Sequence, residues 1–172
     1  MAPFLADKST IQQGFLTSEP LKAIKAGVQP VVHLLADNGY VSYATTLETT
    51  QKLVNERPDV VQRFVDATIE GWYSYLYGDR TAANALIQKD NPDMDNEQLA
   101  YSHAKMLEYG IADSGDALKL GIGAMTDARW KEFADTMIKA GVYPAGTDVT
   151  KGYTLRFVNK GHGLDVKRSL KR

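Results

Sequence analysis

The sequence contains no cysteine. Disulfide bonds, thiolate catalysis and cysteine-ligated metal sites are therefore excluded, and the redox environment of the protein is left open. Histidine is scarce, and His33, His103 and His162 lie far apart, so none has a partner at metal-ligand spacing. We interpret each as a structural histidine. The acidic stretch of residues 90–95 lacks the glycine that a calcium-binding loop requires at its sixth position, so we expect no metal site.

Charge of one sign and long apolar runs are also missing. The net charge is −1, and no basic face or stripe indicates nucleic-acid binding. The basic residues of the tail, residues 164–172, lie beyond the last apolar pattern, so we expect a solvated and poorly ordered end. No run approaches the roughly 18 apolar residues of a membrane helix. Residues 1–7 lack the cationic start and apolar core of a signal peptide.

Motifs of catalysis and of cofactor binding are absent as well. The sequence has no Gly-x-Ser-x-Gly, P-loop or Ser-x-x-Lys pattern, and it nominates no pair of carboxylates. The lone pair Gly121 and Gly123 lacks the third glycine of a dinucleotide fingerprint and follows no convincing strand. We therefore expect no catalytic residue, no cofactor and no enzyme activity.

The 172 residues have the composition of a globular chain, with 44% hydrophobic and 24% charged residues. This length corresponds to one domain or to part of a larger one. The first third predicts strands at residues 10–17, 28–37 and 40–46, from apolar runs rich in β-branched and aromatic residues. With the helices that follow, the sequence predicts an α/β fold that is mostly helical in this segment.

Helices dominate from residue 47 onward. The sequence predicts helices over residues 49–56, 59–77, 80–89, 95–109 and 126–141. In the second of these, apolar residues recur at spacings of three and four, as on one buried face. Asp95 and Gln98 form a capping-box pair, and Thr126 is a good N-cap. A last apolar segment, residues 153–158, is a strand or a short helix.

The stretch of residues 10–20 is the first place where we expect a ligand. It predicts a strand that runs directly into a helix, with Ser18 as N-cap, Pro20 in the first turn and Gly27 as the C-terminal stop. The first turn of a helix presents backbone N–H groups without partners, and these attract anions or polar headgroups. The alternative interpretation is an ordinary capped turn that binds nothing.

Several short motifs, taken in their order, resemble the C-terminal half of substrate-binding proteins of ABC importers. The resemblance is strongest to the group that binds nitrate, sulfonates, taurine and thiamine-pyrimidine precursors, and it covers most of residues 3–163. The motifs are Gln13-Gly14-Phe15-Leu16-Thr17-Ser18-Glu19-Pro20, then Gly39-Tyr40 and Tyr43, then Pro58-Asp59-Val60-Val61-Gln62-Arg63-Phe64-Val65 with Gly71-Trp72, and finally Gly121-Ile122-Gly123-Ala124-Met125-Thr126-Asp127 with Arg129-Trp130.

The resemblance implies a partial periplasmic-binding-protein fold of type II, a hinged venus-flytrap that lacks its N-terminal half. Residues 1–39 would end the second lobe, residues 40–46 would cross the hinge, and residues 47–163 would complete the first lobe. A small solute would bind in the cleft between lobes without any catalysis, and a membrane permease would be the partner of the full-length protein. The resemblance also implies a periplasmic location.

The family-style ligand contacts would come from two places in this sequence. Gln13, Thr17, Ser18 and Glu19 belong to the strand-to-helix segment, and Tyr43 lies near the hinge. The expected solute is nitrate-like, sulfonate-like, taurine-like or pyrimidine-like. Because Glu19 carries a negative charge, a ligand with an amine or a ring N–H is as good a candidate as a bare anion.

The chain departs from the family in its length. Such proteins are about twice as long, well above the commonest domain size, and the half that would supply the opposite wall of the cleft has no counterpart here. We expect exposed apolar side chains at Val41, Leu47, Phe64 and Trp72, which favour self-association. We also expect the chain alone to bind solute weakly or not at all.

Two other interpretations stay open. One is an enzyme fragment related to thiamine-precursor synthesis, since the same resemblance extends to those proteins. That site would need histidine and cysteine, and this chain has no cysteine. The other is a stand-alone helical interaction module over residues 47–141.

Overall fold

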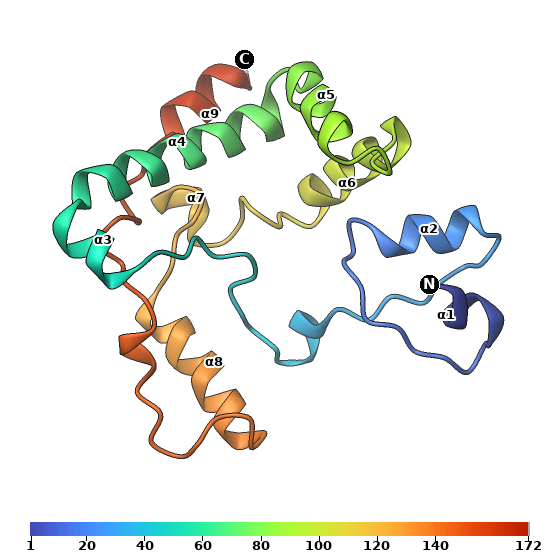
Figure 1. Cartoon of the computed structure of the whole chain (residues 1–172), viewed down its shortest axis with the longest axis horizontal. Coiled ribbons are helices and arrows are strands. Elements are labelled where there is room, and N and C mark those ends of the chain that lie inside the picture. Colours follow the sequence, from blue (N-terminus) through green and yellow to red (C-terminus); the bar gives the residue numbers. More distant parts are fainter. Residues whose placement is uncertain (172) are drawn as a thin grey trace. The chain divides into compact units, whose positions relative to one another are not determined.

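The regular elements of the chain are helices. The computed structural model describes residues 1–171, and within them no strand or sheet is present (Figure 1). The expected α/β fold, and with it the partial venus-flytrap fold of the periplasmic-binding-protein type, is therefore wrong. Apolar, β-branched composition indicates only that a segment tolerates an extended backbone; a strand also needs a neighbouring segment that pairs with its N–H and C=O groups.

The three predicted strands take other forms. Residues 10–17 are coil leading into a hydrogen-bonded turn, in which the amides of Ser18 and Glu19 both donate to the Phe15 carbonyl. Residues 28–34 are coil, followed by the 3₁₀ helix η1 (Leu35–Asn38). Residues 40–46 are coil except for a bend at Thr45. None of these segments joins a ladder.

The helices fall into two compact units that interleave along the sequence. Unit 1 contains residues 1–33 and 75–112, and unit 2 contains residues 34–74 and the chain from Asp113 onward. The segments expected from the sequence at residues 1–39, 40–46 and 47–163 stay predictions.

Unit 1 is built on two longer helices and two short ones. Its core contains Leu21, Ala23, Leu76 and Leu99. The buried His103 donates from Nε2 to the carbonyl of Leu76, in the last turn of its helix, at 2.9 Å. A carbonyl at a helix end has no partner within the helix, so this contact confirms His103 as a structural histidine. The helices of the unit are α1 (Ala2–Ala6), α2 (Glu19–Lys25), α5 (Thr81–Asp90), α6 (Asn96–Glu108) and the end of α4 (Pro58–Tyr77).

Unit 2 is organised around the part of α4 before Tyr75. Val65, Ile69 and Tyr73 face its core at a spacing of four residues, as on one side of a helix. The apolar face predicted from the sequence is right for Val65 and Ile69, but it omits Tyr73 and includes Phe64 and Trp72, which are exposed. Figure 1 shows α9 lying along α4. The other elements of the unit are η1, α3 (Gln51–Glu56), α7 (Ala117–Leu120), α8 (Asp127–Lys139), the 3₁₀ helix η2 (Val149–Lys151) and α9 (Leu164–Leu170).

Tyr73 is the central side chain of unit 2. Its exposed fraction is 0%, and its hydroxyl accepts a hydrogen bond from the Ile122 amide at 3.1 Å. Burial raises the pKa of this phenol, because the charged form would lose its hydration. Gly163 packs against the ring, and a Cβ there would lie only 2.7 Å from Cδ2 of Tyr73. Close packing at this point therefore requires glycine.

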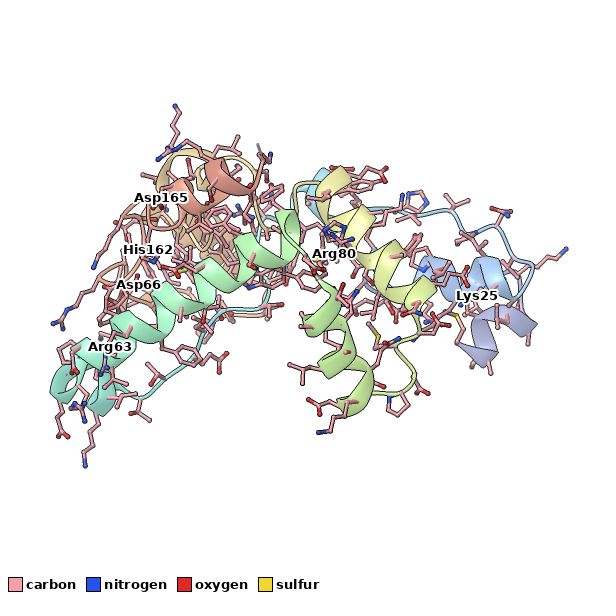
Figure 2. All side chains as sticks on the ribbon, turned by 90° about the horizontal axis from the view of Figure 1, so that it is seen from above. Lys25, Arg63, Asp66, Arg80, His162 and Asp165 are labelled. Carbon is pink, nitrogen blue, oxygen red and sulfur yellow. The ribbon has the colours of Figure 1, made fainter. Side chains whose placement is uncertain are left out.

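Polar contacts attach α9 and the residues before it to the rest of unit 2. His162 Nε2 lies 2.8 Å from Glu70 Oε1, and Figure 2 shows His162 beside α4. Lys167 of α9 pairs with Asp113 at 2.6 Å, and the Asp113 side chain is only 3% exposed. The expectation of a poorly ordered tail is wrong for residues 164–170. These residues form a helix, and the ion pair of Lys167 attaches one face of that helix to the rest of unit 2. Arg172 lies outside the described residues.

The helix predictions are confirmed over α3, α4, α5, α6 and α8. Their signals are local. The Asp95 side chain accepts from the Gln98 amide at 2.7 Å, and the Thr126 hydroxyl accepts from the Arg129 amide at 3.2 Å. No helix among the described residues is long and apolar enough to cross a membrane.

The expected exposure of apolar side chains is confirmed at three of four positions. Leu47, Phe64 and Trp72 are 55%, 63% and 38% exposed, whereas Val41 is half-buried. Self-association through these side chains remains a prediction.

The contact between Gly163 and Tyr73 gives a first test, with Gly146 as the matched control. Both glycines have positive φ, +75° and +82°, so alanine at either costs about 1–2 kcal/mol of backbone strain. Only at Gly163 does the new methyl group also overlap a buried ring, which adds roughly 1–3 kcal/mol. Urea unfolding should therefore show a larger loss of stability for Gly163→Ala than for Gly146→Ala. Equal losses would contradict this account of the packing.

Candidate functional site

The N-terminal stretch predicted to bind a ligand lies in unit 1, and one of its own side chains occupies it. The Glu19 carboxylate turns back and accepts a hydrogen bond from the Phe15 amide at 2.6 Å. Gly14 makes room for it, because a Cβ at Gly14 would lie 2.7 Å from Cγ of Glu19. A backbone N–H group that could attract an anion is thus already satisfied by a carboxylate of the chain.

The other predicted contacts of this stretch serve the turn as well. Ser18 is the N-cap residue, but its side chain makes no capping hydrogen bond and its hydroxyl lies 3.3 Å from Glu19 Oε1. Helix α2 has only seven residues, so its dipole is short. Gln13 is exposed. The structure therefore brings Thr17, Ser18 and Glu19 together in one turn, with Gln13 on the coil before it.

Polar contacts from α6 hold this turn in place. The Thr17 carbonyl accepts two hydrogen bonds, from Gln98 Nε2 at 2.9 Å and from the Ser102 hydroxyl at 2.7 Å. At the other end of α2, Lys25 pairs with Asp95 at 3.0 Å and with Glu97 at 2.8 Å (Figure 2). These carboxylates raise the pKa of Lys25.

The Thr17 carbonyl gives the second test. Ser102→Ala removes the shorter of its two hydrogen bonds from a partly buried site, which should cost about 1 kcal/mol of local stability. Hydrogen exchange of the α2 amides should then quicken about fivefold, because opening this turn becomes easier. Ser169→Ala, which removes an exposed contact within α9, is the control and should leave α2 exchange unchanged. Unchanged α2 exchange in both variants would show that Ser102 does not hold the turn.

Tyr43, the fifth predicted contact, belongs to unit 2 and lies among aromatic side chains. Its hydroxyl accepts from the Thr126 amide at 2.8 Å, at the start of α8. Its ring centroid lies 5.2 Å from that of Trp130, at a tilt of 51°. The Arg129 guanidinium lies 4.5 Å from the Tyr43 ring centroid and donates to the Ser42 carbonyl at 2.9 Å.

A third ring completes a cluster that we name the aromatic stack, consisting of Tyr43, Trp130 and Tyr153. The rings of Trp130 and Tyr153 are nearly parallel, with an angle of 11° and centroids 4.9 Å apart. The Tyr153 hydroxyl donates to Asp127 Oδ1 at 2.5 Å. The nearby carboxylate, with partial burial, raises the pKa of Tyr153 to about 12.

Local sequence explains the position of the two side chains from α8. The cap at Thr126 fixes where the helix begins, so that Asp127 is its first residue and Trp130 lies three residues further, on the same face. The indole Nε1 of Trp130 is buried and has no hydrogen-bond partner. A buried donor of this kind costs free energy unless a partner reaches it.

The stack combines three chemical features suited to one class of ligand. Aromatic faces favour flat rings, a free indole N–H offers a donor, and the Asp127 carboxylate accepts from N–H or O–H groups at a ring edge. In contrast, the described residues contain no cluster of histidine, aspartate and glutamate able to hold a metal ion. These groups have the chemistry needed to contact a planar, hydrogen-bonding molecule.

Of the stack, the sequence predicts only Tyr43 as a ligand contact. The expectation of a strand or short helix over residues 153–158 is wrong, because this segment is coil and turn. The motif Thr126-Asp127 with Arg129-Trp130 was a usable signal, because it places a cap, a carboxylate and an indole within one helical turn. Nothing in the local pattern placed Tyr153, which reaches the stack from a distant coil.

Comparison with known proteins gives one similarity. The chain is 24% identical over 178 aligned positions to the riboflavin-binding protein RibY of Chloroflexus aurantiacus. The match covers 93% of this chain and 45% of that protein, so the chain spans about half the length of this relative. No protein-family model and no solved structure matches the chain. The similarity associates the chain with a small-molecule-binding protein.

The hydrogen bond between Tyr153 and Asp127 gives a prediction for high pH. Because the folded pKa of Tyr153 is about 12 and the ordinary value is 10.0, the bond contributes its full stability below pH 10 and loses it as the pH rises through 12. Tyrosinate absorbance should therefore lose a late titration step in Tyr153→Phe. In Asp127→Asn the same step should move to lower pH. A wild-type titration curve in both variants would refute the assignment.

Proposed function

We propose that this chain binds a flat heteroaromatic solute of the riboflavin type through the aromatic stack. The observation that carries the proposal is the parallel stacking on Trp130, with a carboxylate at the edge of the stacked ring. The similarity to a riboflavin-binding protein supports the same ligand class. The isoalloxazine ring of a flavin is planar and carries an imide N–H, which matches an aromatic face and an acceptor.

The carboxylate at the edge of the ring stacked on Trp130 favours this ligand over a small anion at that position. Asp127 would repel nitrate or a sulfonate at the position where it now accepts from Tyr153. In unit 1, the Glu19 carboxylate already accepts from the Phe15 amide. Of the five contacts predicted from the sequence, Tyr43 enters this proposal, whereas Gln13, Thr17, Ser18 and Glu19 stay predictions.

We also propose that the protein delivers its solute to a membrane permease of an ABC importer, from a periplasmic location. The support is the ordered set of motifs that resembles importer substrate-binding proteins, together with the binding role of the relative. Because the chain spans about half the length of that relative, residues outside it would contribute to the complete binding site and to the permease contact.

Fluorescence titration tests the proposed ligand. Riboflavin emission should be quenched on addition of the 172-residue chain, since stacking on indole quenches flavins. Trp130→Ala should weaken binding by roughly tenfold, the size of one lost stacking contact. Trp130→Phe should keep most of the affinity, because it keeps an aromatic face. Trp72→Phe alters the other tryptophan, on α4, and should bind like the wild type.

Two results would overturn this proposal. One is the absence of quenching at chain concentrations of about 1 mM, the weak limit for a specific small-molecule site. The other is equal affinity in Trp130→Ala and the wild type, with circular dichroism showing both folded. Nitrate and taurine, added in competition, should leave the flavin signal unchanged, because they carry no ring to stack.

A further inference from the structure

We propose that Tyr153 competes with the ligand for the stacking face of Trp130, and that Asp127 selects ligands by accepting a hydrogen bond from the edge of the stacked ring. This inference rests on the proposed function. If the two compete, the ring and hydroxyl of Tyr153 show the position and orientation that a ligand ring would take. The two rings would exchange on one indole face, and the same carboxylate would accept from either of them.

The geometry of Tyr153 is that of a bound aromatic ligand. Its ring lies at 11° to the indole plane with the centroids 4.9 Å apart, which is an offset-stacked arrangement. Its donor group ends 2.5 Å from a carboxylate oxygen. A flat ring with an N–H or O–H at its edge would satisfy the same two contacts.

The segment that carries Tyr153 has little buried surface to lose. Every residue of 140–152 is exposed except Val149, which is half-buried, and Gly152 and Thr154 on either side of Tyr153 are exposed. Within this segment η2 contacts α8, and the first buried side chain after Tyr153 is Phe157. Segments with few buried apolar contacts open at low free-energy cost. Moving Tyr153 out of the stack should therefore require less free energy than moving Trp130, which is part of a helix.

Asp127, in contrast, is held at a defined position. It is the first residue of α8, directly after the Thr126 cap, and the amide of Thr126 donates to Tyr43. The carboxylate would therefore stay in place when Tyr153 withdraws. It would accept a hydrogen bond from a ring N–H, and it would disfavour a ring that is methylated at that nitrogen, because the acceptor would then lose its partner.

The competition has a quantitative consequence. The apparent dissociation constant equals the intrinsic one divided by the fraction of molecules in which the indole face is open. An internal stack of ordinary strength by itself keeps that fraction near one in five or six, and the hydrogen bond from Tyr153 to Asp127 lowers it further. Removing the Tyr153 side chain should therefore tighten binding by at least about fivefold.

Riboflavin titration of the full 172-residue chain and of Tyr153→Ala tests the competition. We expect Tyr153→Ala to bind at least about fivefold more tightly than the wild type. The matched control is Tyr143→Ala, which removes a half-exposed tyrosine of the same segment that contacts Phe133 outside the stack. Tyr143→Ala should bind like the wild type. In the background Trp72→Phe, the emission of Trp130 alone should report riboflavin binding.

A flavin methylated at its imide nitrogen tests the role of Asp127. The wild type should prefer riboflavin over this analogue by roughly tenfold, and Asp127→Ala should bind the two with nearly equal affinity. A preference that persists in Asp127→Ala would show that shape, not the carboxylate, rejects the methyl group, and would overturn this part of the inference.

The outcomes separate the two proposals. Riboflavin binding that is unchanged or weaker in Tyr153→Ala overturns the competition and leaves the proposed function standing. Absence of binding to both the wild type and Tyr153→Ala overturns the proposed function, and the inference with it. Tighter binding in Tyr153→Ala but not in Tyr143→Ala supports both.

Discussion

The candidate site depends on the first turn of α8. Thr126 satisfies one amide of that turn with its side chain, and its own amide donates to the Tyr43 hydroxyl at 2.8 Å. These two hydrogen bonds fix where the helix begins and tie a coil segment, far away in the sequence, to it. The carboxylate of Asp127 and the indole of Trp130 follow from that start, because a helix determines the direction of each side chain.

The N-terminal turn of unit 1 shows how the chain itself can use groups that would attract a ligand. The features that make a helix start attractive to a ligand, unsatisfied amides and partial positive charge, are equally available to the chain itself. The amides of Ser18 and Glu19 at the helix start donate to the Phe15 carbonyl, and the Glu19 carboxylate accepts from the Phe15 amide before the helix. Two hydrogen bonds from α6 hold the Thr17 carbonyl. A capped turn is therefore evidence of a helix start, and it becomes evidence of a ligand only where other groups converge on it.

In unit 2 several groups do converge. Aromatic rings from a coil, from a helix and from a second coil meet beside a carboxylate, and a buried indole N–H there has no partner. Polar groups that are imperfectly satisfied cost stability, and proteins tolerate such costs chiefly where binding requires them. The riboflavin-binding protein similar to this chain matches 93% of it but only 45% of its own length, and this similarity suggests small-molecule binding.

The longer helices and their caps could be predicted from the sequence, and so could Tyr43 as a candidate contact. Periodicity placed α4, and single residues such as Asp95 and Thr126 set the starts of α6 and α8, because capping and helical spacing act within one or two turns. Two other features depend on the tertiary structure. The segments expected as strands do not pair with any other segment among the described residues, and Tyr153 stacks on Trp130 although it lies 23 positions further along the chain. Strand pairing and ring contacts both join segments that are distant in the sequence. A local sequence pattern carries no information about which distant segment will make such a contact.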